Sequence, residues 1–309
     1  MNLPAQARTG TAGRGKGILL VIAAAVLWST SGLFAKAPAF DALDTESRVA
    51  VMVFWRALLA AVVTAVLVRR PAWTWRMLPM MACFAAMNWA FLQALVATES
   101  TTAIWLQYTA PVYVLLGGLV LFGEKTGRGD LRFVALSLAG LAIILAGQVS
   151  HASPRGLACG ILAGVLYAGV ILSLRGLRDY DSAWLVFLNL TATAIAFLPV
   201  CFTLGRIPQT SQWWYLAGFG VLQLGLPYVL FARGLRYITS HEASLIVLLE
   251  PILVPVWVYL FWRNTTGYEP PAATTIAGGV IILASLAWRY GTAARGVRQT
   301  GPPQPSGEG

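Results

Sequence analysis

Ten apolar runs, separated by short polar segments, dominate the hydrophobic pattern of the chain. Each run is long enough to cross a bilayer core, which is about 30 Å thick and needs a helix of about 20 residues. The alternating ten-residue segments that would indicate a β-barrel are absent from the pattern. We therefore expect an all-α integral membrane protein with ten transmembrane helices. The predicted spans cover residues 17–36, 49–68, 77–97, 102–122, 131–148, 156–174, 184–204, 213–232, 243–262 and 273–289.

Both ends of the chain are polar. Residues 1–16 and 291–309 predict disordered tails, since they are rich in small, basic and proline residues. The first apolar run has a basic flank and an Ala35-Lys36-Ala37 sequence, as a cleaved signal peptide would. Its apolar stretch is longer than a typical signal peptide allows, so we interpret it as a retained first helix.

Composition supports a membrane protein. Of the 309 residues, 58% are apolar and 11% are charged, against about a quarter charged in soluble proteins. The net charge of +10 would suggest nucleic-acid binding in a soluble chain. Here the basic residues flank the apolar runs, where they meet anionic lipid headgroups. We expect membrane lipid as a partner and no nucleic acid.

The basic residues also predict an orientation. If the N-terminus is cytoplasmic, cytoplasmic segments hold 16 of the 22 Lys and Arg residues, external segments hold five, and Arg56 lies within a span. This bias follows the positive-inside rule. An even number of spans then puts both termini in the cytoplasm of a bacterial-type cell, with the protein in its inner membrane.

An internal repeat divides the chain into two halves. A shift of 140 residues gives eight identities within residues 91–127, and shifts of 138 and 139 extend the match in both directions. Each half has five spans, so consecutive halves cross the membrane in opposite directions. The predicted fold is two inverted five-helix repeats, a design that suits alternating access with the substrate held between the halves. The eight matched positions are Phe91, Leu95, Ser100, Ala103, Pro111, Val114, Thr126 and Gly127.

Four short motifs occur in order along the chain: Ala24-Ala25-Val26-Leu27-Trp28-Ser29, Phe54-Trp55-Arg56, Thr109-Ala110-Pro111-Val112 and Leu249-Glu250-Pro251-Ile252. They resemble motifs of the EamA branch of the drug/metabolite transporter superfamily. The resemblance implies two EamA-like repeats, at residues 17–148 and 156–290. It also implies a ten-helix basket around a cavity lined by spans 1, 3, 4, 6, 8 and 9, and the export of amino acids or related metabolites.

Two charged residues lie inside the predicted spans. A charge in the bilayer costs about 2.5–3.5 kcal/mol, so it must face a cavity or a partner. Arg56 either attracts an anionic group of the substrate or anchors neighbouring helices. Glu250 precedes the helix-breaking Pro251 and either exchanges protons, binds substrate or accepts backbone hydrogen bonds. Proton or exchange coupling therefore stays open.

Neutral polar and aromatic side chains complete the expected substrate site. Buried amides and phenols need partners, and a substrate can supply them, although contacts between helices or aromatic packing can do the same. Trp28 and Tyr167 are equivalent in the two halves, as are Asn88 and Tyr228. The full predicted site comprises Trp28, Arg56, Asn88, Gln93, Trp105, Gln107, Tyr108, Tyr167, Gln223, Tyr228 and Glu250.

No cofactor or metal is expected, because neither metal-ligand spacing nor a GxxxxGK[ST] loop occurs in the sequence. A membrane-embedded enzyme would need clustered acids or a nucleophile–base pair, which Arg56 and Glu250 do not form. We expect a secondary transporter or facilitator of a small molecule, not an enzyme. A sugar or nucleotide-sugar carrier and a structural or sensory subunit are the alternatives, and a monomer and a homodimer are both compatible with the sequence.

Overall fold

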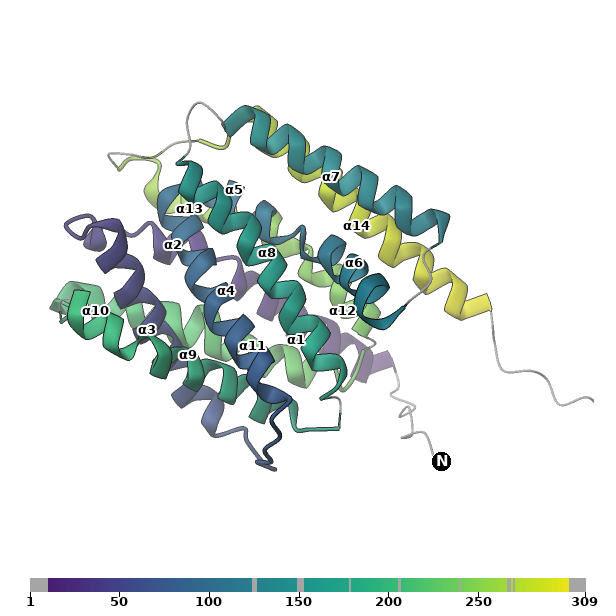
Figure 1. Ribbon diagram of the computed structural model, residues 1–309, viewed down its shortest axis with the longest axis horizontal. Helices are drawn as coiled ribbons and strands as arrows, with labels where there is room; N and C mark the ends of the chain where they lie inside the picture. The colour runs from purple at the N-terminus through teal and green to yellow at the C-terminus, as the bar shows by residue number, and fades with distance from the viewer. Residues whose placement is uncertain are drawn as a thin grey trace, which may run out of the picture.

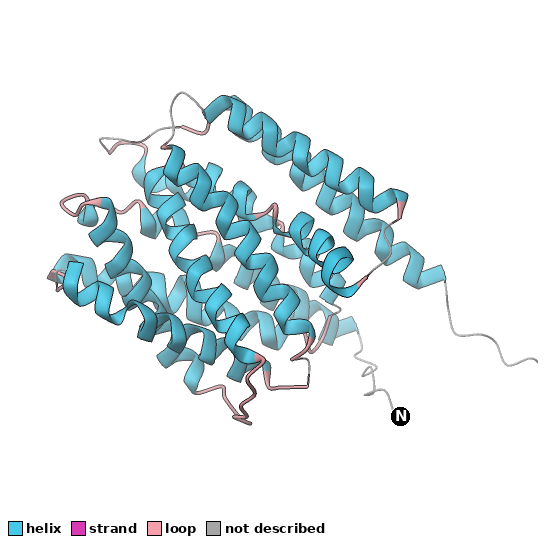
Figure 2. Cartoon of the chain, viewed as in Figure 1, coloured by secondary structure: helices cyan, strands magenta, loops and turns pink. Residues whose placement is uncertain are grey.

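Every regular element among the described residues is helical, so the all-α prediction is confirmed (Figures 1 and 2). The computed structural model describes residues 11–123, 127–148, 153–177, 179–204, 207–238, 240–265, 268 and 270–299. The first helix begins and the last helix ends at the same end of the bundle in Figure 1, which we call the terminal face. The opposite end is the far face.

Eight helical spans are long and apolar enough to cross a membrane. A span of 21 residues extends about 32 Å, which matches the bilayer core. The spans are α1 with α2 (Thr11–Trp28, Ser31–Ala35), α3 (Thr45–Ala65), α4 (Met77–Ala97), α5 with α6 (Ser100–Gln107, Ala110–Phe122), α7 (Arg128–Gln148), α8 (Pro154–Arg175), α9 (Ser182–Leu204), and α10, η2 and α11 (Thr210–Ala217, Gly218–Gly225, Leu226–Gly234).

Two shorter apolar helices coincide with the last two predicted spans. The first is α13 (Leu249–Trp262), which follows α12 (Ser240–Val247). The second is the apolar part of α14 (Ala273–Gln299). A short 3-10 helix, η1 (Pro38–Phe40), links α2 to α3.

The first and last helices extend into the segments predicted as tails. α1 begins at Thr11, and its Arg14 bonds to Glu242 of α12 at 2.6 Å, which fixes the added turn. α14 continues to Gln299. Residues 1–10 and 300–309 lie outside the described part of the chain.

Two helix breaks occupy equivalent positions in the two halves. α5 ends at Gln107, shortly before Pro111, and α12 ends at Val247, shortly before Pro251. Proline lacks an N–H and clashes with the carbonyl four residues earlier, so the ladder of backbone hydrogen bonds is interrupted. The carbonyl oxygen of Val247 instead accepts a hydrogen bond from the Tyr108 hydroxyl at 3.2 Å. The breaks therefore place polar backbone in the middle of the bundle.

Helices that pack together in the structure have counterparts in the other half that also pack together. α4 packs on α8, and the equivalent pair α11 and α1 also packs together. α3 packs on its own counterpart α9, and α7 on its counterpart α14. Figure 1 shows α7 and α14 side by side along one edge of the bundle.

Two glycines set the spacing of α7 and α14. A Cβ added at Gly140 would lie 2.7 Å from the carbonyl oxygen of Gly278, which is too close for any side chain. The two backbones touch directly at this crossing, as is common where membrane helices carry small residues. Gly140 and Gly278 are equivalent in the two halves, so the contact lies between repeats.

Candidate functional site

A cavity of about 340 Å³ lies between the two halves, a size typical of small-molecule sites. We call it the central cavity. Its wall includes residues of α1, α4, α5, α8, η2, α11 and α13, and also of α3 and α9. Leu174 and Ser182, which lie beside the α8–α9 turn, are also part of its wall.

Nine of the eleven residues predicted from the sequence line this cavity. They come from segments far apart in the chain, and the two central helix breaks bring several of them together. These residues are Trp28, Arg56, Asn88, Gln107, Tyr108, Tyr167, Gln223, Tyr228 and Glu250.

Gln93 and Trp105 lie outside the central cavity. Gln93 is buried, and its amide donates a hydrogen bond to Glu46 at 3.3 Å. The Trp105 indole packs against Gly279 of α14, although its ring also meets that of Tyr108 edge-on at 6.4 Å. Both side chains fill contacts between helices in the structure.

The wall also includes residues that the sequence did not single out. Asn189 of α9 is one of two polar members of this group, with Ser182, and it is buried within a long apolar helix. The remaining members are mainly apolar, and they include Phe84, Met87, Phe91, Val170, Ile171, Leu185 and Val186.

Arg56 is held firmly on one side. Its Nη2 donates to Asn88 Oδ1, and the Asn88 amide in turn donates to the carbonyl of Phe84 at 2.9 Å. The guanidinium lies 4.6 Å above the ring of Phe219, a favourable cation–π geometry. Its Nη1 has no hydrogen-bond partner among the described residues. Arg56 thus combines a structural anchor with a donor that an anionic ligand can satisfy.

Glu250 lies in the first turn of α13, immediately after the helix break. The hydroxyl of Tyr108 donates to its Oε2 at 2.9 Å, and it shares this one hydrogen with the Val247 carbonyl at 3.2 Å. An ionised carboxylate offers about four acceptor positions, so this bond leaves room for a donor from a ligand. The start of a helix also favours a negative charge.

Two amide oxygens of cavity-lining residues have no hydrogen-bond partner in the described structure. Gln223 donates through its nitrogen to the carbonyl of Trp28 at 3.2 Å, which leaves its Oε1 unsatisfied. The Oδ1 of Asn189 is unsatisfied as well. An unpaired buried polar atom costs about 1–3 kcal/mol. The site therefore has one cationic donor and several acceptors with which a ligand can form hydrogen bonds.

Aromatic rings form much of the remaining wall. Trp28 meets Tyr228 edge-on at 5.3 Å and Phe231 at 5.4 Å. Tyr167 and Tyr108 add further rings. Such a wall suits a solute with both charged and apolar parts.

The chain belongs to the EamA-like transporter family, which matches residues 15–146 and 154–290. It is therefore a multi-pass membrane transporter, and it is not an enzyme. The two matched ranges agree with two repeat halves.

Individual transporters with similar sequences support this family assignment. An uncharacterized transporter of Archaeoglobus fulgidus is 32% identical over 203 residues, covering 65% of this chain and 71% of the relative. The transporter YxxF of Bacillus subtilis is 29% identical, covering 67% and 68%. The pseudopaline exporter CntI of Pseudomonas aeruginosa is 26% identical, covering 86% and 93%. A crystal structure that is 18% identical superposes on 91% of this chain and 98% of its own with a TM-score of 0.60, which shows the fold alone.

Proposed function

We propose that this protein is a secondary carrier that exports a small zwitterionic metabolite, such as an amino acid or a related solute. The observation that carries this proposal is the pairing of one guanidinium, Arg56, with one carboxylate, Glu250, in an otherwise aromatic and apolar cavity. Arg56 Nη1 fits a substrate carboxylate. Glu250 and the free oxygens of Gln223 and Asn189 fit a substrate ammonium group.

Alternating access is the proposed mechanism. The ten apolar segments would form ten transmembrane helices, as inverted five-helix repeats covering residues 17–148 and 156–290. Support comes from helix pairing that maps onto itself between the halves, and from a cavity at their interface. Rocking of one half against the other would expose Arg56 and Glu250 to each side in turn.

Export is the proposed direction, from the cytoplasm across a bacterial inner membrane. The positive-inside bias favours cytoplasmic termini, and Leu174 and Ser182, beside the α8–α9 turn, line the central cavity. The solute would then load from the cytoplasmic side. The relative CntI carries the name of an exporter, which agrees with this direction. The proposed carrier acts as a monomer or homodimer within the lipid.

A sugar or nucleotide-sugar carrier is the main alternative within the same superfamily. Phosphates would require several basic side chains, and among the described lining residues Arg56 is the one with a permanent positive charge. A structural or sensory subunit would have a packed interior, whereas this interior contains a cavity of about 340 Å³. Both observations favour a zwitterion carrier.

The test uses purified protein reconstituted into liposomes. A panel of radiolabelled amino acids, amines, sugars and nucleotides is loaded inside or outside, and flux is compared with protein-free liposomes. The proposal expects flux of neutral amino acids that saturates, with little flux of sugars or nucleotides. Saturable flux of sugars or nucleotides with no flux of amino acids would refute it in favour of the alternative.

A further inference from the structure

The first membrane span is interrupted between α1 and α2, although neither helix contains a proline. The interruption falls at Ser29 and Thr30. Each hydroxyl donates to the carbonyl three residues earlier, that of Val26 or Leu27, at 2.6 Å. Such bonds compete with the ladder of backbone hydrogen bonds and bend helices. The equivalent helix of the second half, α8, is continuous at the matching positions.

The two sides of this break are attached to different helices. α1 packs mainly along α11. The Trp257 indole of α13 donates to the Ser29 hydroxyl at 2.8 Å. The Trp262 indole, also of α13, donates to the carbonyl of Leu33 in α2 at 2.9 Å. Pro255 interrupts the backbone bonds of α13 just before these tryptophans, so α2 and this end of α13 can tilt while α1 stays on α11.

The break lies at the edge of the central cavity. Trp28, the last residue of α1, lines that cavity, and its carbonyl accepts a hydrogen bond from the Gln223 amide at 3.2 Å. Gln223 lines the same cavity, and its Oε1 has no partner among the described residues. A solute in the central cavity would therefore contact residues directly beside the break.

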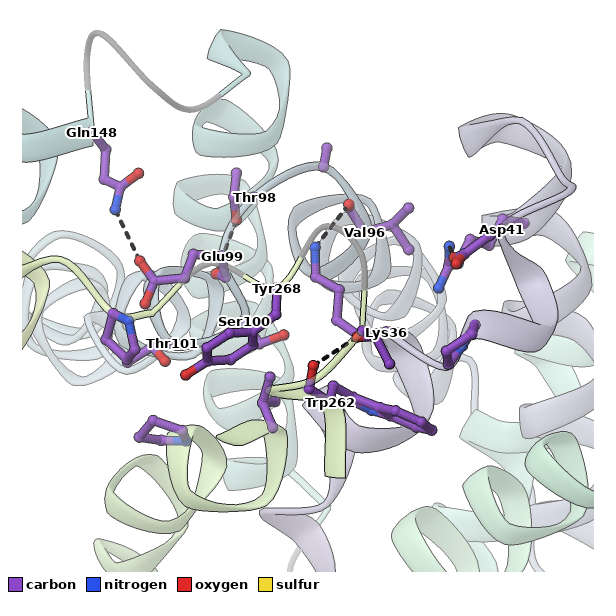
Figure 3. Close-up of a pocket in the computed structure, with 17 residues that line it drawn as sticks. Lys36, Asp41, Val96, Thr98, Glu99, Ser100, Thr101, Gln148, Trp262 and Tyr268 are labelled. Atoms are coloured by element: carbon purple, nitrogen blue, oxygen red, sulfur yellow. Dashed lines mark hydrogen bonds and ion pairs between the residues drawn. The ribbon is translucent and has the colours of Figure 1, made fainter. Parts of the chain in front are cut away.

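A second pocket of about 410 Å³ lies beyond α2 at the far face, and we call it the far pocket (Figure 3). It is lined by the end of α2, η1, the α4–α5 turn, the end of α7, and α13 with the turn that follows. Figure 3 shows Lys36 and Trp262 on one side of the far pocket and Glu99 and Gln148 on the other. Lys36 directly follows α2, whereas Trp28, which lines the central cavity, precedes the break. With five residues, α2 is about 7.5 Å long, so it forms a thin partition between the two cavities.

α2 closes tightly against α5 and α13. A Cβ added at Gly32 would lie 2.8 Å from Val258 Cγ2 and 3.0 Å from Ser100 Cβ, so a side chain fits there only if its neighbours shift. Among the described residues, no hydrogen bond joins α2 to α5. The hydroxyls of Ser31 and Ser100 are buried without a hydrogen-bond partner in the described structure. Their desolvation is not offset while α2 is closed, which favours a second state in which water reaches them.

We propose that α2 is the gate on the far side of the central cavity, and that the solute leaves through the far pocket when this gate opens. The gate turns about Ser29 and Thr30. The bonds from Trp257 and Trp262 keep α2 on α13, and the contact with Ser100 of α5 is the one that separates. In the structure the gate is closed. This inference rests on the proposed function, since it assigns the exit route of that carrier.

Two disulfide cross-links that share one cysteine test the gate. The background protein has its three native cysteines replaced with alanine. Gly32→Cys/Ser100→Cys joins α2 to α5, and Gly32→Cys/Val258→Cys joins α2 to α13; both pairs lie within the reach of a disulfide. After oxidation with copper phenanthroline, the first pair should lose at least tenfold of the flux of radiolabelled L-leucine in liposomes, and dithiothreitol should restore it. The second pair should keep at least half of the background flux.

Binding of L-leucine to each oxidised protein shows that the fold and the central cavity are intact. Undiminished flux in oxidised Gly32→Cys/Ser100→Cys would overturn the gate and leave the proposed function standing. Loss of flux in both oxidised pairs would overturn the joint movement of α2 and α13. Neither binding nor flux of any amino acid by the wild type would refute the proposed function, and the inference with it.

Hydrogen exchange followed by mass spectrometry tests the gate in the wild type, without any substitution. Saturating L-leucine should speed the exchange of amides in residues 29–36 and 256–262 at least threefold, because binding promotes opening. Exchange in residues 17–26 should stay unchanged, since α1 remains on α11. Equal exchange at residues 29–36 with and without L-leucine would overturn the gate, whether or not either cross-link forms.

Discussion

Replacing Arg56 with Gln tests whether the central cavity recognises a carboxylate. The substitution removes the positive charge and the Nη1 donor, which lacks a partner among the described residues. Gln can still donate a hydrogen bond toward Asn88, so part of the anchor is retained. The loss should therefore fall on the ligand more than on the fold.

The expected magnitude follows from the bonds that Arg56 offers. A hydrogen bond to a charged group contributes about 1.5–3 kcal/mol. At about 1.4 kcal/mol for each tenfold change, this corresponds to about a 10- to 150-fold loss of affinity. The low exposure of Arg56, 3%, limits screening by water and favours the upper part of this range.

The assay compares L-leucine with L-leucinamide, which keeps the ammonium group and lacks the carboxylate. Arg56→Gln should weaken the binding of leucine by the factor above and leave that of leucinamide unchanged or improved. Arg76→Gln, which removes an exposed arginine that stacks on Trp75, serves as the matched control and should alter neither ligand. An equal loss for both ligands would show that Arg56 acts only through structure.

Three further outcomes are expected. Gly140→Ala should lower the unfolding temperature in detergent, by an amount that corresponds to about 1–3 kcal/mol, because its Cβ would collide with Gly278 O; Gly15→Ala, with nothing within 4 Å, should be neutral or slightly stabilising. If proton exchange at Glu250 couples flux to a pH gradient, Glu250→Gln should abolish the effect of an imposed gradient, and an unchanged dependence would rule out Glu250 as the coupling site. Burial raises the pKa of the Glu99 carboxyl above its ordinary 4.5, so the folded state binds its proton more tightly than the unfolded chain. Stability should therefore fall as pH rises from 4.5 through the raised pKa, and Glu99→Gln should remove this slope in melting curves, whereas a parallel slope in the variant would contradict the assignment.

The lengths of the apolar runs and the internal repeat predicted most of the fold. Apolar length located the helices, since a membrane span leaves few other solutions. Pro251 predicted a helix break, and the structure has one shortly before it and another shortly before its counterpart Pro111. The extension of α1 to Thr11 was not predicted, because it depends on Arg14 meeting Glu242, a contact 228 residues away in the chain.

The candidate site was harder to predict, because the sequence does not show which side of the helix a polar residue in an apolar run faces. Gln93 follows Asn88 by five residues, which turns it about 140° around α4 and away from the cavity. It bonds to Glu46 instead. Asn189 was missed because it is the one amide in its run, and because its counterparts in the first half, Val49 and Ala50, are apolar.

The charges of the central cavity break the symmetry of the halves. The helix pairing and the two helix breaks occur in both halves, and Asn88 and Tyr228 occupy equivalent positions. Arg56, however, corresponds to Ile195 or Ala196 at shifts of 139 or 140 residues, and Glu250 corresponds to Ala110. Duplicated charges would place like charges near each other in a medium of low dielectric constant, which is costly. A symmetric scaffold suits a motion that reverses, whereas one cation and one carboxylate suit a solute whose two ends differ. The repeated fold would then account for alternating access. The two charged residues that have no charged counterpart in the other half, Arg56 and Glu250, would account for the choice of solute.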